Sequence, residues 1–183
     1  MLSFASGLSQ DSGVIAIFVN EKYDYKDKKG ILSNIVAQKI NSFLSVLKAK
    51  KKEDDISSFD ISGKQKCFII KVKKKYESYF SQDIGGSFFS YLKKFKDINK
   101  IDLYADSLNL DKKALVIFFS QFIFGFNLKS YTFNKYKTTN KERINKKIIF
   151  KIITSHKDNL QKKYKYYDAI KEGVFLSRDL VSE

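Results

Sequence analysis

Apolar residues follow two kinds of spacing along this chain of 183 residues. Residues 13–21, GVIAIFVNE, form a β-branched and aromatic run between a glycine and polar residues, which is typical of a buried strand. In residues 31–48 the apolar side chains instead recur every three or four positions, the spacing of an amphipathic helix. The two patterns alternate along most of the chain and therefore predict a fold in which strands and helices follow one another.

The same patterns predict further elements. Two strands, SSFDIS and KQKCFIIKV, flank Gly63 and should be joined by a tight turn. Ser81 is expected to cap the N-terminus of a helix that runs to Phe95. The remaining expected elements are a strand at 100–106, an apolar helix at 111–128, a strand at 146–154 and a closing helix from about residue 159.

The closing helix is predicted to be amphipathic, with one apolar face directed inward. Its expected inner residues are Tyr167, Ile170, Val174 and Val181. Its expected outward residues are Asp168, Lys171 and Glu172.

The helix at 111–128 is so apolar that it must be covered on nearly all sides. This favours a sheet with helices on both faces, a three-layer α/β/α domain that ends in a terminal helix. The longest apolar run, 114–128, is shorter than the roughly 20 residues of a membrane span. The N-terminus lacks the features of a signal peptide. The single Cys67 cannot form an internal disulfide, which agrees with a reducing cytoplasm, so we expect a cytoplasmic protein with no membrane partner.

The charge is strongly positive, with 35 Lys and Arg against 20 Asp and Glu and a net charge of +15. A Lys-rich surface that binds a polyanion such as DNA or RNA is one explanation. However, Arg143 and Arg178 are the only arginines, and the lysines are dispersed and often adjoin acids. Abundant Lys, Ile, Asn, Phe and Tyr without any Pro favours a compositional origin in an AT-rich genome, and the polyanion-binding module remains the alternative.

Local signals for catalysis are weak. His156 is the only histidine and has no metal-binding neighbour in sequence, so a surface or capping role is favoured. Cys67 lies within a predicted strand and is expected to be an inert buried thiol. Gly85 and Gly86 could open a phosphate-binding turn, but close packing of a helix on the sheet explains them better. Residues 53–55 are most simply a solvated turn, and the chain's own residues give no catalytic or metal site.

Two stretches resemble a known family. GFNLKSYTFNKYKT, residues 125–138, looks like the segment that ends the N-terminal domain of leucyl (cytosol) aminopeptidases. AIKEGVFLSRDLVSE, residues 169–183, resembles the interdomain helix of the same family, and DIGGSFFSYLKKF is similar to a Gly-Gly helix in the middle of that domain. The matching positions of the first two stretches are Tyr131, Phe133, Tyr136, Lys137 and Thr138, then Gly173, Arg178, Asp179, Leu180 and Glu183.

The resemblance implies a macro-domain-like mixed sheet and a division into an N-terminal domain, residues 1–155, and a connecting helix, residues 156–183. The parent would be a cytoplasmic, hexameric metallopeptidase that releases N-terminal residues from peptides. Its catalytic domain, expected beyond Glu183, would hold two divalent metals, zinc or manganese. This chain would hold none and be inactive alone, and its partners would be its own catalytic domain and other copies in the hexamer. The quoted positions are expected to have structural roles.

The sequence departs from the family at one place. A Gly-rich turn commonly follows the central strand there, whereas here Val72 is followed by three lysines. A nucleotide pocket inherited from macro domains is therefore a third and weaker hypothesis.

Overall fold

The computed structural model describes residues 2–8, 13–27, 30–50, 54–73, 78–132 and 148–182. One sheet of six strands has the order β1-β6-β5-β2-β4-β3, and every pair is parallel except β3 with β4. The strands are β1 Leu2–Ala5, β2 Val14–Val19, β3 Ile56–Ser62, β4 Gln65–Lys71, β5 Lys100–Tyr104 and β6 Ile149–Ile153. The helices are α1 Asn34–Ala49, α2 Ser78–Leu92, α3 Lys112–Ser130, α4 Lys157–Ser182 and the short 3-10 helix η1 Ala105–Ser107.

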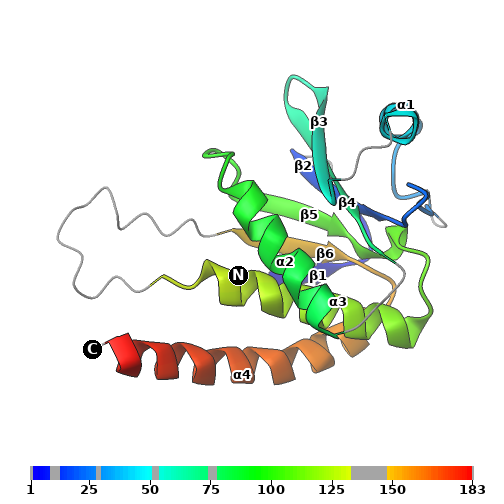
Figure 1. Ribbon diagram of the computed structural model, residues 1–183. Helices are drawn as coiled ribbons and strands as arrows, with labels where there is room; N and C mark the ends of the chain where they lie inside the picture. Colours follow the sequence, from blue (N-terminus) through cyan, green and yellow to red (C-terminus); the bar gives the residue numbers. More distant parts are fainter. Residues whose placement is uncertain are drawn as a thin grey trace.

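The sheet has a buried core on each face. Strand β2 shows why: Phe18 packs toward α2 and α3, while its neighbour Ile17 packs toward α1, because successive side chains of a strand point to opposite faces. The α2 and α3 side is rich in phenylalanine, and the rings of Phe18 and Phe119 meet edge to face at 4.7 Å. Figure 1 shows α1 alone on one side of the sheet and α2, α3 and α4 on the other. The predicted three-layer α/β/α fold with a mixed sheet is confirmed.

Helices α2 and α3 cross at two glycines. A Cβ atom added to Gly85 would lie 2.0 Å from the carbonyl oxygen of Phe122, and one added to Gly125 would lie 2.0 Å from that of Gln82. Only glycine allows the two backbones to come this close. The prediction that Gly85 packs a helix on the sheet is therefore wrong in its partner, because Gly85 packs on another helix.

Two local expectations also differ from the structure. Ser81 does not cap α2, since the helix begins three residues earlier at Ser78 and Ser81 is fully buried inside it. Strand β1 was not expected from the pattern, because its four residues contain no apolar run and it pairs at the sheet edge with β6.

The terminal helix α4 runs along α3 (Figure 1). Leu160 is fully buried at its start and joins the core, and Tyr164 packs against that core. The predicted inner face is only partly right, because Ile170 and Val181 are 37% and 89% exposed. The predicted outward residue Lys171 is half-buried instead, because α4 contacts α3 through polar side chains on this face.

Candidate functional site

The end of α3 and the C-terminal part of α4 meet in a junction of four side chains. Tyr131, which follows the last turn of α3, donates a 2.5 Å hydrogen bond from its hydroxyl to a carboxylate oxygen of Asp179. The guanidinium of Arg178 donates to the carbonyl of Leu128 at 3.1 Å. It also lies 5.3 Å from the ring centroid of Tyr131, whose other neighbour is the ring of Phe175 at 5.0 Å.

Each contact of this junction has a physical reason. The last carbonyls of a helix lack partners within the helix, and Arg178 supplies one for α3. The hydrogen bond to Asp179 raises the pKa of Tyr131, because ionising the phenol would place two negative charges side by side. The junction therefore fixes where α4 lies against the end of α3.

This junction brings together three of the residues on which the family resemblance rests: Tyr131, Arg178 and Asp179. Two others stay apart from it, since Leu180 is 65% exposed and a Cβ on Gly173 would meet no atom within 4 Å. The remaining positions, Phe133, Tyr136, Lys137, Thr138 and Glu183, lie outside the described residues. The structural roles expected for these positions stay a prediction.

A second set of polar contacts joins α3 to α4 nearer the core. Asn127 donates to the hydroxyl of Tyr164 at 3.2 Å, and this hydroxyl donates to Asp168 at 2.9 Å. The ammonium of Lys171 reaches the same carboxylate oxygen at 2.6 Å. Gln121 donates to the hydroxyl of Tyr167 at 3.1 Å. We call these contacts the α3–α4 polar seam.

The seam changes the ionisation of its members. Burial, followed by the hydrogen bond to Asp168, raises the pKa of Tyr164 to about 12. Burial acts to raise the pKa of Asp168, but hydrogen bonds from Lys171 and Tyr164 outweigh it and the pKa is lowered. The seam was missed by sequence reasoning, although Tyr164, Asp168 and Lys171 recur at the spacing of one helix face.

The opposite face of α4 is apolar and open to solvent. Among the described residues, the exposed large apolar side chains concentrate here. We call them the outer stripe of α4: Tyr166, Ile170, Leu176, Leu180 and Val181, at 59%, 37%, 62%, 65% and 89% exposure.

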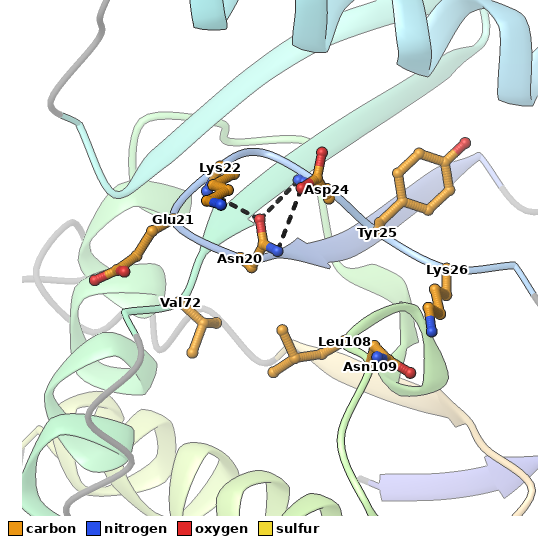
Figure 2. A pocket seen from close by; sticks show the side chains of 9 residues that line it. All are labelled: Asn20, Glu21, Lys22, Asp24, Tyr25, Lys26, Val72, Leu108 and Asn109. Atoms are coloured by element: carbon orange, nitrogen blue, oxygen red, sulfur yellow. Dashed lines mark hydrogen bonds between the residues drawn. The ribbon is translucent and has the colours of Figure 1, made fainter.

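A crevice of about 480 Å³ lies at the carboxyl ends of β2, β4 and β5. Figure 2 shows Val72 and Leu108 facing each other across it, with Asn20, Lys22 and Glu21 on one side and Lys26 and Asn109 on the other. In open α/β sheets, ligands bind outside the carboxyl ends of the strands, where the connections from neighbouring strands run to opposite sides of the sheet. Here the chain leaves β2 toward α1 on one side, and leaves β4 and β5 toward α2 and α3 on the other.

The structure places the residues that the sequence analysis considered for catalysis or metal binding. Cys67 is fully buried, and burial raises the pKa of its thiol. The carbonyl of His156 accepts the first hydrogen bond of α4 from Leu160, so His156 is at a capping position. Asp55 lies 3.5 Å from the ammonium of Lys73, and Glu53 lies outside the described residues. Within the described ranges, no group of three or more His, Cys, Asp or Glu residues could hold a metal ion, so this part of the chain does not fit a metal centre.

Several lysines that suggest a polyanion surface are engaged with acids. The ammonium groups of Lys48 and Lys66 lie 2.9 and 2.5 Å from the carboxylates of Asp24 and Asp60. These ion pairs neutralise part of the positive charge of the surface, which leaves less of it to attract a polyanion. No helix in the described part of the chain is long and apolar enough to cross a membrane.

Two curated proteins match about half of the chain. A probable cytosol aminopeptidase of Phytoplasma mali (strain AT) is 37% identical over 102 residues, which is 54% of this chain and 20% of that protein. A probable cytosol aminopeptidase of Agrobacterium fabrum (strain C58) is 33% identical over 91 residues, which is 48% of this chain and 18% of that protein. No family model matches the chain.

A solved aminopeptidase structure shares the fold of this chain over its whole length. A mutant of tomato leucine aminopeptidase has a TM-score of 0.73 at 15% identity, covering 100% of this chain and 38% of that one. The resemblance to the N-terminal domain of leucyl aminopeptidases is confirmed. The macrodomain of Thermus aquaticus DarG has a TM-score of 0.56 at 9% identity, covering 84% of this chain and 98% of that one, which shows a shared fold. The chain thus spans well under half of its aminopeptidase relatives.

Proposed function

We propose that the chain serves as the non-catalytic N-terminal domain of a cytosolic leucyl aminopeptidase. It positions the catalytic half of the enzyme and supports its oligomer. The parent enzyme would release N-terminal residues from peptides with two divalent metals, zinc or manganese, held by the catalytic half. The similarity to cytosol aminopeptidases over about half of the chain supports this proposal.

The observation that carries the proposal is the two-sided character of α4. One side is fastened to α3 by the polar seam and by the Tyr131–Asp179 hydrogen bond. The other side presents the outer stripe, in which Leu176 and Leu180 are each more than 60% exposed. Exposed apolar patches of this kind mark interaction surfaces in soluble proteins. A fixed helix with an open apolar face is suited to hold a second domain in one orientation.

The test is binding in trans. The chain is mixed with the catalytic half of the Phytoplasma mali relative, prepared without its matched segment, and the affinity is measured by calorimetry. We expect the double variant Leu176→Asp, Leu180→Asp to bind at least about tenfold more weakly, because apolar anchors at an interface each contribute about 1–2 kcal/mol or more.

The matched control is Gln161→Asp, which places the same carboxylate at an exposed position of α4 away from the outer stripe. It should bind like the wild type. Equal affinity of the stripe variant and the control would contradict the proposal, and so would a wild-type chain that does not bind at all.

A second measurement concerns catalysis. The purified chain alone should not hydrolyse leucyl amide substrates when zinc or manganese is added, because its described residues offer no metal-binding group. Metal-dependent turnover at the stoichiometry of the purified chain would overturn the non-catalytic role.

A further inference from the structure

We propose that the outer stripe receives a helix of the catalytic half whose backbone comes close to that of α4 at Gly173, an inference that rests on the proposed function. Three features support this partner. They are the position of Gly173 in the stripe, the furrow that the side chains around it form, and a glycine crossing of the same kind inside the fold.

Gly173 lies at the centre of the outer stripe. Ile170 and Leu176 stand three positions before and after it. Tyr166 and Leu180 stand seven positions before and after it, so they share its side of the helix. Among the described residues, a Cβ atom added to Gly173 would meet nothing within 4 Å. Glycine weakens the interior of a helix relative to alanine, so its presence here points to a contact outside this domain.

The side chains around Gly173 form a furrow along α4. Ala169 and Ser177, four positions before and after the glycine, are small and exposed, and with it they form one row along the helix. The rows on either side carry larger members of the outer stripe: Tyr166 and Ile170 on one side, Leu176 and Leu180 on the other. Helices interlock through ridges of residues spaced by four, so a low row between two high rows can receive a ridge of another helix.

The furrow can be buried without leaving a polar side chain unpaired. The hydroxyl of Ser177 already donates to the carbonyl of Gly173 at 2.9 Å. Arg178 points to the end of α3, where it donates to a backbone carbonyl. Glu172, at the rim of the furrow, lies 2.9 Å from the ammonium of Lys171. A docking helix therefore avoids the cost of burying a group that has lost its hydrogen bond.

The fold already contains a contact of this kind. Helix α2 crosses α3 at Gly125, where an added Cβ atom would lie 2.0 Å from the carbonyl oxygen of Gln82. Gly125 has apolar residues three positions before and after it, Phe122 and Leu128. Gly173 repeats this pattern on the open side of α4. The pattern that admits α2 onto α3 therefore indicates a helix as the partner of α4.

The catalytic half is the source of helices that fits this face. The chain covers 20% of the Phytoplasma mali relative and 38% of the tomato enzyme, so most of such an enzyme lies outside the part that this chain matches. Under the proposed function that remainder is joined to this domain, which holds its helices at a high effective concentration beside α4.

The experiment enlarges the side chain at position 173. Binding of the full chain to the catalytic half of the Phytoplasma mali relative, first shown to be folded by circular dichroism, is measured by calorimetry. Gly173→Ala should bind about five- to tenfold more weakly and Gly173→Leu at least about fiftyfold more weakly, because extra methyl groups overpack a close contact. On a flat apolar surface the same groups would leave the affinity unchanged or raise it.

Two controls separate docking from folding. Thermal unfolding of the chain alone should show both Gly173 variants to be at least as stable as the wild type, because the new side chain meets no atom of the described domain within 4 Å of its Cβ. Ser45→Leu enlarges an exposed serine of α1 that makes the same hydrogen bond to the carbonyl four residues earlier. It should bind like the wild type.

The failures of the two proposals are distinguishable. If the wild type binds and Gly173→Leu binds equally or more tightly, the close helix contact is wrong and the proposed function stands. A wild-type chain that does not bind overturns both. Self-association of the chain alone that is lost in Gly173→Leu, measured by sedimentation, would assign the furrow to a second copy and overturn the helix of the catalytic half as its partner.

Discussion

Helix α3 makes two contacts that differ in kind. Against α2 each helix sets a glycine against the backbone of the other, and the backbones approach so closely that no Cβ atom fits at Gly85 or Gly125. Against α4 it meets hydroxyl, amide, carboxylate and ammonium groups that hydrogen-bond across the seam. The first contact combines this close backbone approach with aromatic packing, such as that of Phe89 on Phe126 at 5.1 Å, and tolerates no added Cβ atom at the two glycines. The second fixes the register of α4 by hydrogen bonds between side chains, so each of its members can be replaced without a collision of backbones.

The largest expected effect tests the glycine crossing. Gly85→Ala should destabilise the fold by about 3 kcal/mol, because the new methyl group collides with the backbone carbonyl of Phe122. The measurement is urea unfolding followed by circular dichroism. Gly86→Ala is the matched control, since its Cβ would meet Lys129 at an ordinary 3.5 Å and alanine favours a helix over glycine. Equal effects of the two variants would show that the crossing is not sterically limited.

The seam should be weaker and sensitive to acid. Asp168→Asn should cost about 1.5 kcal/mol at neutral pH, because hydrogen bonds to a charged group are lost in a half-exposed position. A carboxyl with a lowered pKa contributes stability above its unfolded pKa, here 3.8, and loses that contribution as the pH falls through the folded value. Wild type and variant should therefore converge in stability below about pH 4. A constant difference from pH 7 to pH 3 would exclude this origin.

At alkaline pH the same seam has a second titrating group. The pKa of Tyr164 is raised from 10.0 to about 12, so its neutral form stabilises the fold below pH 10 and this contribution is lost between pH 10 and pH 12. Tyr164→Phe should cost about 1 kcal/mol at neutral pH through lost hydrogen bonds. It should also flatten the decline in stability between pH 10 and pH 12. A decline as steep as in the wild type would assign it to other tyrosines.

The smallest expected effect concerns the open side of α4. Gly173→Ala should stabilise the chain by about 0.5–1 kcal/mol, because the added methyl group meets no atom within 4 Å and alanine loses less backbone entropy in a helix. Thermal unfolding measures the change. A loss of stability would mean that Gly173 is covered by a contact on the outer face, which would remove the contrast between the two sides of α4.

The sequence predicted the strands and helices that have long, regular patterns. Strand β2 is apolar throughout and the middle of helix α3 is largely apolar, so both could be recognised because a buried element leaves a long apolar run. Strand β1 escaped detection because four residues at a sheet edge leave no such run. The start of α2 was misplaced, since Ser81 has the chemistry of an N-cap but lies inside the helix.

The candidate sites depended on contacts between distant residues. Tyr131 and Asp179 were singled out by family resemblance, yet nothing in their spacing indicates that one donates to the other. Lys171 was assigned to solvent because it is charged, whereas Asp168 gives it a partner at a half-buried position. The crevice could not be anticipated at all, because three separated segments line it and only the strand order brings them together.

The parallel pairing of β1 with β6 has a consequence for how the chain folds. Leu2 pairs with Phe150, so the first strand of the chain cannot take its place until the last strand has been made. At a synthesis rate of about 5–20 residues per second, this wait lasts roughly 8–30 seconds. In the last part of that time, once β5 has been made, the edge of β5 that receives β6 also stays unpaired. Sheets completed by such long-range pairing fold slowly and expose strand edges in the meantime. The nascent chain should therefore be most prone to aggregation just before β6 has been synthesised.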